Sequence, residues 1–334
     1  MQEHSAGRVS AQELEAAYEQ AVRDTIQRFE ATGSPVITDG EQRKPSFATY
    51  PLDGLSNVAP GGVVIPFKDG HTRQLPKLNA GPFRYGRFAG EYVRRAKPFA
   101  SRPIKQAVIS ASALSLLYPA EGIRNYPRDQ FIEDLIAESV TDISSAFNAG
   151  AETVQVDFTE GRLSLKLDQT GGLLRSFVDL NNRVLERFSH SDRARIGVHV
   201  CPGGDHDSTH SADVDYAGLL PALFSMETGR FYLQLASESD RPRVLELIAK
   251  LLRPDQKVFV GVVDPISQHV ETPEEVRDRV LQAARFLPLD RLGTTDDCGF
   301  SPFADDVSTA RDLAFAKIRA RVEGTAMAAA QLGP

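Results

Sequence analysis

The sequence contains no apolar run that approaches the roughly 20 residues needed to cross a bilayer as a helix. Its first residues also lack the apolar segment of a secretory signal. Acidic and basic residues are interspersed, with a net charge of −7 and no basic stripe, so no nucleic-acid partner is predicted. The chain has only 2 cysteines, and without an export signal they predict reduced thiols and not a disulfide. We therefore expect a cytoplasmic protein.

No glycine-rich nucleotide-binding turn follows the first predicted strand, which argues against a doubly wound fold. Nothing in the sequence indicates a redox or nucleotide cofactor. The composition is that of an ordinary globular protein, with 41% hydrophobic and 25% charged residues. A chain of 334 residues with this composition can build a sizeable core, either as two average domains or as one large barrel.

Strand-like and helix-like segments alternate along most of the chain. Strands that alternate with helices of ten to twenty residues pair in parallel, and regular repetition of this unit predicts a TIM-type (β/α)8 barrel. We expect one domain, residues 1–334, with a long ordered excursion at 44–83 and an extended loop at 202–216. Only seven strands are convincing, so the barrel either lacks its first strand or has another segment in its place. The predicted helices are 11–32, 84–99, 128–149, 173–188, 218–226, 241–252, 273–286 and 308–332.

The stretch RIGVHVCPGGD, residues 195–205, reads as a short buried strand that ends in glycines. His199 and Cys201 are two residues apart, so their side chains point to the same side of this strand. Cys298 follows another predicted strand. Imidazole and thiolate are good zinc ligands, and three of them leave one coordination position open, as in catalytic sites. The alternative is a buried strand with a satisfied histidine and a small apolar cysteine.

Three acids also lie at predicted strand ends. Asp39 and Glu41 share a face by the i, i+2 rule and would bind a ligand amine, or they cap a turn. Asp157 lies in an otherwise apolar strand, where a buried acid needs a partner or a function. The structural alternative for Asp157 is an ion pair, and its candidate partners are Arg43, Arg162 and Lys166. His206 and His210 lie in a polar loop and are predicted to be surface histidines. Asp296 and Asp297 would accept a hydrogen bond from His199 or cap a turn.

With these residues in view, the chain resembles the C-terminal catalytic domain of cobalamin-independent methionine synthase and its single-domain relatives. The motifs that carry the resemblance occur in the same order as in that family: TDGEQRKPSF at 38–47, VQVDF at 154–158, RIGVHVC at 195–201 and DDCGF at 296–300.

The resemblance implies a barrel with one Zn²⁺, held here by His199, Cys201, Cys298 and a fourth ligand that is usually glutamate. Glu41 and Asp157 would bind the amino group of homocysteine. The most direct alignment puts Leu235 at the position of the glutamate ligand, so Glu238, three residues later, is the predicted fourth ligand, with water as the alternative.

The chain departs from the family pattern at several places. The DEPA sequence of the family reads DFTE here, the opening strand with a GS-x-P-R type motif is absent, and no folate-binding half precedes the barrel. We therefore expect methyl transfer to a thiol, with homocysteine as the first candidate and with methylfolate or a methyl-carrying protein as donor. One alternative is alkyl transfer to another thiol, as in epoxyalkane:coenzyme M transferase, and another is a catalytically idle barrel that binds a partner. Both a monomer and a homo-oligomer are compatible with the sequence.

Overall fold

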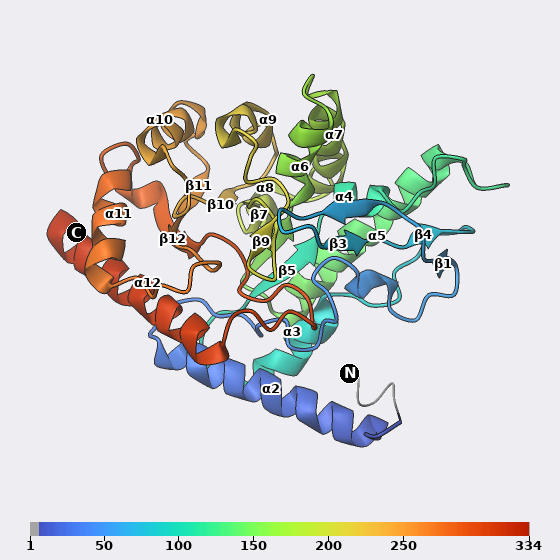
Figure 1. Ribbon diagram of the computed structural model, residues 1–334, viewed down its shortest axis with the longest axis horizontal. Helices are drawn as coiled ribbons and strands as arrows, with labels where there is room; N and C mark the ends of the chain where they lie inside the picture. Colours follow the sequence, from blue (N-terminus) through green and yellow to red (C-terminus); the bar gives the residue numbers. More distant parts are fainter. Residues whose placement is uncertain (1–6, 334) are drawn as a thin grey trace.

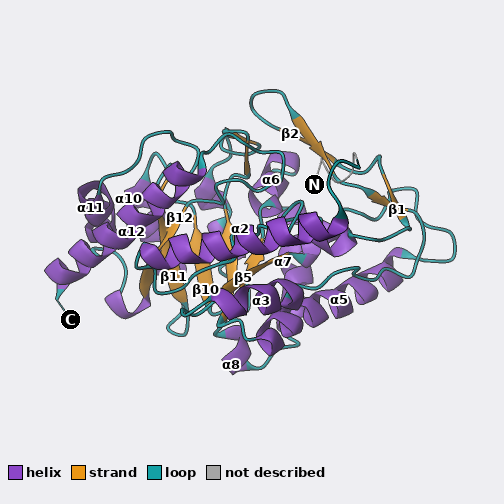
Figure 2. Ribbon diagram, turned by 90° about the horizontal axis from the view of Figure 1, so that it is seen from below, coloured by secondary structure: helices purple, strands orange, loops and turns teal. Residues whose placement is uncertain are grey.

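The computed structural model describes residues 7–333. At its centre is a six-stranded sheet in the order β12-β11-β10-β7-β6-β5, in which every neighbouring pair is parallel (Figure 2). An isolated parallel bridge between Ile37 and Ile104 adds a seventh strand position beside β5. This is a (β/α)8-type barrel with seven strand positions. The six strands are β5 (Lys105–Ile109), β6 (Thr153–Asp157), β7 (Ile196–Val200), β10 (Arg230–Leu233), β11 (Lys257–Val263) and β12 (Leu292–Asp296).

Helices follow the strands and cover the outer face of the sheet (Figure 1). Val154, Val198 and Val258 point outward and are fully buried in the main core beneath these helices. The covering helices are α4 (Ala111–Ser115), α5 (Arg128–Ala149), α6 (Glu160–Leu167), α7 (Gly172–Leu185), α8 (His190–Arg193), α9 (Leu220–Leu223), α10 (Arg241–Leu251), α11 (Pro273–Ala283) and α12 (Arg311–Leu332).

The sheet does not close through strands. Between β12 and the Ile37 position, residues 7–333 hold no further strand. Helix α2 (Ala11–Ala31) packs Val22 and Ile26 against Ile37 on one side of this gap. On the other side, Thr325 of α12 contacts Thr294 of β12 through their hydroxyl groups.

Two ion pairs join these helices: Arg28 of α2 lies 2.5 Å from Asp312, and Arg311 of α12 lies 2.8 Å from Asp24. Both views show the two helices meeting end to end along this side of the molecule (Figures 1 and 2). Two helices therefore take the place of the strand that the sequence lacks.

Aromatic rings fill the interior of the barrel. Tyr232 of β10 and Phe259 of β11 stack with ring centroids 4.7 Å apart. A Cβ atom at Gly197 would overlap the ring of Tyr232, and one at Gly293 would overlap the ring of Phe259. The glycines on β7 and β12 thus make room for the two rings.

Residues 44–83 contain two small antiparallel ribbons. In one, β1 (Val58–Ala59) pairs with β4 (Lys77–Leu78), and in the other β2 (Val64–Pro66) pairs with β3 (Thr72–Gln74). The extended loop contains a third ribbon, β8 (Gly204–Asp205) with β9 (Ser208–Thr209).

A buried carboxylate holds these loops together. Asp205 accepts a 2.5 Å hydrogen bond from Nε of Arg73 and lies 3.0 Å from His71, both next to or within β3. Arg73 also bonds both carboxylate oxygens of Asp305, each at 2.9 Å. The β2–β3 ribbon, the β8–β9 ribbon and the segment after β12 are therefore joined on the side where the strands end.

The helix predicted at 84–99 is wrong in its first half. Helix α3 spans only Gly90–Ala96, followed by a short 3-10 turn at Lys97–Phe99. The reason lies in tertiary contacts of the preceding backbone. Gly86 donates its N–H to Pro51 at 2.7 Å, and Tyr85 donates its N–H to the carboxylate of Glu138 at 3.0 Å. These amides are satisfied by distant acceptors and not by a helix.

Candidate functional site

The C-terminal ends of β6, β7 and β12 bring the predicted site residues together. Asp157 is the last residue of β6 and pairs in register with His199 of β7. Cys201 directly follows β7, and Cys298 lies two residues beyond the end of β12. Because parallel strands end at one edge of the barrel, residues far apart in the chain meet there.

His199, Cys201 and Cys298 form one compact group. Their ligand atoms all lie within 4.8 Å of one another, and the two sulfur atoms are 2.9 Å apart. His199 and Cys201 are buried, and Cys298 is partly exposed. The Cys201 sulfur also accepts the N–H of Gly203 at 3.3 Å.

Hydrogen bonding shifts the pKa values of the two thiols, Cys201 and Cys298, in opposite directions. The pKa of Cys298 lies well below its usual value. Its sulfur accepts hydrogen bonds from Cys201 and from His199, and these outweigh the opposite effect of desolvation. The pKa of Cys201 is raised well above its usual value by its hydrogen bond to Cys298 and by burial. Burial is the largest single influence on His199 and lowers its pKa, but the hydrogen bond to Cys298 and the charges of Cys298 and Asp157 together outweigh it, so the net shift is upward.

The donor set of this group fits a metal ion. One imidazole and two thiols converge at a single point, which is the combination that a borderline-soft divalent ion such as zinc prefers. Three donors leave one position of a tetrahedral site open, and the partly exposed Cys298 marks the direction of access.

Glu238 is not part of this group among residues 7–333. It lies in the turn after β10, where its N–H bonds the carbonyl oxygen of Leu235 at 3.3 Å, and its side chain is partly exposed. Leu235, the position that the sequence comparison predicted for the glutamate ligand, is fully buried in the core.

The turn after β10 is held instead by the buried carboxylate of Asp297. One oxygen accepts the N–H groups of Leu235 at 2.8 Å and Ala236 at 2.7 Å, and the other accepts the N–H and hydroxyl of Ser237 at 2.8 and 2.9 Å. Asp297 is adjacent to Cys298, so the same turn fixes the backbone of a candidate ligand. The carboxylate reaches the turn only because residue 261 is glycine, where a Cβ would overlap it.

The other two acids do not lie as the sequence suggested. Asp39 and Glu41 are in a turn, with Gly40 at φ 65° and Glu41 at φ 54°, so the strand rule does not apply and they share no face. Asp39 is buried and its Oδ1 accepts the N–H of Glu41 at 2.9 Å, which is the turn-capping arrangement. Glu41 is partly exposed, and one of its oxygens lies 2.6 Å from Nζ of Lys44.

Within residues 7–333, Asp157 forms an ion pair with none of its three predicted partners. Its Oδ1 accepts a 2.8 Å hydrogen bond from Gln155, whose own oxygen accepts one from Nζ of Lys105 at 2.7 Å. Burial raises the pKa of Asp157 to about 6, and the charge of Glu41 raises it while that of His199 lowers it. Burial also lowers the pKa of Lys105 to about 8. A polar chain therefore runs from Lys105 inside the barrel up to the candidate metal ligands.

The cations considered as partners of Asp157 are used elsewhere. Arg43 pairs with Glu15 at 2.5 Å, and Lys166 pairs with Asp213 at 2.9 Å. Arg162 donates to Gln234 at 2.8 Å and to backbone oxygens of the 202–216 loop.

The predicted surface position is wrong for His210, one of the two loop histidines. His210 is buried rather than on the surface, and burial lowers its pKa to about 4. His206 is partly exposed and lies with Asp205 and Asp306 in a second cluster of metal-type ligands. Arg73 already neutralises Asp205 there. This second cluster is a loop junction and not a second site.

The sequence-based reasoning missed two cations, Lys44 and Lys105. Lys44 follows Glu41 at a spacing of three residues, and Lys105 interrupts an apolar strand, so each left a signal in the sequence.

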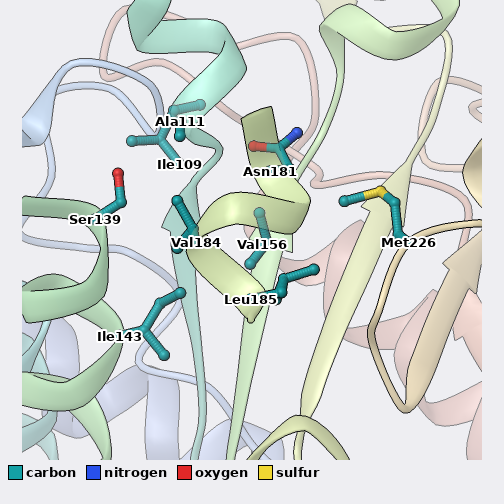
Figure 3. Close-up of a pocket in the computed structure, with 9 residues that line it drawn as sticks. All are labelled: Ile109, Ala111, Ser139, Ile143, Val156, Asn181, Val184, Leu185 and Met226. Atoms are coloured by element: carbon teal, nitrogen blue, oxygen red, sulfur yellow. The ribbon is translucent and has the colours of Figure 1, made fainter. Parts of the chain in front are cut away.

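A small cavity lies apart from these residues, between β5, β6 and helices α5 and α7 (Figure 3). Seven of its nine lining side chains are apolar and the other two are Ser139 and Asn181. It offers no titratable group and is a packing defect of the core.

None of the helices in residues 7–333 combines the length and apolar character that a membrane span requires.

Comparison with known proteins gives a consistent result. Residues 1–314 match the family model described as cobalamin-independent synthase, catalytic domain. A methionine synthase of Saccharolobus solfataricus is 23% identical, with 96% of this chain and 87% of that protein aligned. A 5-methyltetrahydropteroyltriglutamate–homocysteine methyltransferase of Aeromonas salmonicida is 25% identical over 89% of this chain but only 38% of its own length.

Among solved structures, a B12-independent methionine synthase from a Shewanella species in complex with selenomethionine superposes with a TM-score of 0.76. It is 20% identical, and the match covers 97% of this chain and 91% of that one. At this level of identity the likeness establishes the barrel fold.

Proposed function

The chain belongs to the family of cobalamin-independent synthase catalytic domains, and from that premise we propose that it transfers a methyl group to the sulfur of homocysteine, giving methionine. The observation that carries the proposal is the convergence of His199, Cys201 and Cys298 beside Asp157 at the open end of the barrel. An idle barrel has no need to bring an imidazole and two thiols to one point.

We assign His199, Cys201 and Cys298 as the ligands of one Zn²⁺, with Glu238 or water in the fourth position before the substrate arrives. When bound, the zinc would let the acceptor thiol exist as a thiolate at neutral pH. In the transfer, the acceptor sulfur forms a bond to the methyl carbon while the bond from that carbon to the donor breaks. The thiol proton replaces the methyl group on the donor, so the reaction is balanced without an oxidant or a reductant.

The chain's own residues have two tasks in this scheme. The partly exposed carboxylate of Glu41 and the carboxylate of Asp157 bind the ammonium group of homocysteine. The stacked rings of Tyr232 and Phe259 occupy part of the barrel interior, and the acceptor would enter from the strand ends. Methylfolate and a methyl-carrying protein are both compatible donors.

The proposal is tested without knowing the donor. The purified protein should contain about one zinc per chain by elemental analysis, and Cys298→Ser should lose most of it. Homocysteine binding to the zinc protein should release about one proton, measured by calorimetry in buffers of different ionisation enthalpy. Glu238→Ala tests the fourth position in the same assay: retention of zinc at the wild-type level would favour water there, and loss of zinc would favour Glu238. A folded protein that binds no zinc would refute the proposal, while tight binding of thiols without an amino group would favour another acceptor.

A further inference from the structure

A buried ammonium group lies against the acid that is proposed to bind the substrate. The side chain of Lys44 is only 1% exposed. Its Nζ donates to Glu41 Oε1 at 2.6 Å and to the carbonyl oxygen of Ala107 on β5 at 2.9 Å. It also lies 4.2 Å from the centre of the Tyr50 ring. Lys44 therefore has a fixed position, set from three sides.

The contact leaves half of the Glu41 carboxylate free. Oε1 is engaged by Lys44, whereas no hydrogen bond to Oε2 is present within residues 7–333. The side chain of Glu41 is 32% exposed, so Oε2 is open to a ligand. The contact with Lys44 fixes the orientation of this carboxylate. Without Lys44, the side chain of Glu41 could rotate and lose this orientation.

Lys44 lies among several carboxylates. Asp39, Glu41 and Asp157 are all close enough for their charges to act on its ammonium group. Asp39 is buried, and its Oδ2 has no hydrogen-bond partner within residues 7–333. A ligand ammonium group at Oε2 of Glu41 would therefore meet a region rich in carboxylates.

We propose that Lys44 is the positioning residue for acceptor recognition: it holds Oε1 of Glu41 so that Oε2 receives the α-ammonium group of the acceptor thiol. The inference rests on the proposed function, because it takes the acceptor to be an amino acid. It adds a residue that does not touch the substrate but decides how strongly an amino group is recognised. If Lys44 instead took the place of the substrate's ammonium group, thiols without an amino group would bind more tightly, and the experiment below distinguishes the two roles.

The experiment compares two thiols, homocysteine and its analogue without the amino group, by calorimetric binding to the zinc-loaded protein. In the wild type, homocysteine should bind about 10- to 100-fold more tightly than the analogue, the effect of one hydrogen-bonded charge pair. In Lys44→Met this preference should fall to about 3-fold or less, with binding of the analogue unchanged. Lys44→Arg should restore most of the preference, because it returns a cation to the same place.

Further variants separate a specific role from a structural one. Glu41→Gln keeps Lys44 but should also abolish the preference, and adding Lys44→Met to it should cost nothing more. If Lys44→Met weakens both thiols equally, or raises the preference for homocysteine, the inference is overturned while thiol binding stands. If the wild type binds neither thiol, the proposed function fails and the inference fails with it. Should Lys44→Met not fold, Lys44→Gln takes its place: it keeps a hydrogen-bond donor but no charge, and the same loss of preference is expected, while an unchanged preference overturns the inference.

Discussion

Gly261→Ala is a direct test of how the site is held together. Gly261 lies on β11, and a Cβ there would overlap Oδ1 of Asp297 and lie 2.7 Å from the backbone nitrogen of Leu235. The new methyl group would therefore stand in the path of the hydrogen bonds from Leu235 and Ala236 to this oxygen, which measure 2.8 and 2.7 Å. The carboxylate, the turn after β10 or both must move.

The magnitude follows from the bonds that are lost. A hydrogen bond to a charged group contributes about 1.5–3 kcal/mol, so losing two costs about 3–6 kcal/mol. Replacing glycine by alanine stabilises by about 0.4–1 kcal/mol through the unfolded chain, which offsets a small part. We expect Gly261→Ala to lower the free energy of unfolding by about 2–5 kcal/mol, a large share of the roughly 5–15 kcal/mol typical of folded proteins.

The assay is denaturant unfolding followed by circular dichroism, with Gly218→Ala as the matched control. A Cβ at Gly218 would meet only Leu165 at 3.8 Å, an ordinary contact. That variant should stay within about 0.5 kcal/mol of the wild type. Asp297→Ala removes the atom that Gly261→Ala displaces, so the two changes should be clearly less than additive. A Gly261→Ala protein as stable as the control would show that Asp297 does not hold the turn, and the account of this side of the site would be wrong.

Two other changes test the buried charges away from the candidate ligands. Asp142 accepts hydrogen bonds from Tyr50 and Ala89, and burial raises its pKa to about 6, above the unfolded value of 3.8. The folded state therefore holds a proton that the unfolded chain has released, so stability falls as the pH rises from about 4 to 6 and is level above. In Asp142→Asn this fall, up to about 3 kcal/mol, should be missing from unfolding curves measured across that range, and an unchanged pH dependence would contradict the assignment. Arg73→Met removes the guanidinium group that pairs with the fully buried Asp205 and leaves His71 beside it, so it should cost up to about 3–5 kcal/mol in the same assay. Removing an exposed pair, as in Lys77→Met, should cost less than about 1 kcal/mol.

The architecture could be predicted because it rests on local periodicity and on strand ends. Helix 128–149 was placed with its observed bounds, and the alternation of strands and helices indicated the barrel. The convergence of His199, Cys201 and Cys298 also followed from their positions near the ends of parallel strands. What periodicity cannot reveal is where a backbone amide finds a distant acceptor. That is why residues 84–89 are not helical: their amides bond to Pro51 and Glu138.

The polar detail of the site was harder to predict for a related reason. Asp39 and Glu41 were placed by a strand rule, but two consecutive residues with positive φ turn the chain there. Glu238 is a candidate ligand by its spacing from Leu235. Its position is set by the turn after β10, which Asp297 holds through hydrogen bonds to residues about 60 positions earlier in the chain. Such contacts join segments remote in the sequence, and a single chain carries no local signal of them.

The barrel interior contains a buried carboxylate, Asp157, and a buried ammonium group, Lys105, that depend on each other. Barrel interiors are usually filled by branched apolar side chains, but here Lys105, Gln155 and Asp157 form a hydrogen-bonded series below His199. Each charged member costs stability by its burial, as the raised pKa of Asp157 and the lowered pKa of Lys105 indicate. Neither charge is tolerable alone, because an uncompensated buried ion costs several kcal/mol. Together they let a carboxylate stand beside the candidate metal ligands, so part of the stability of the fold is given up to keep an acid at the place where a substrate amino group would bind.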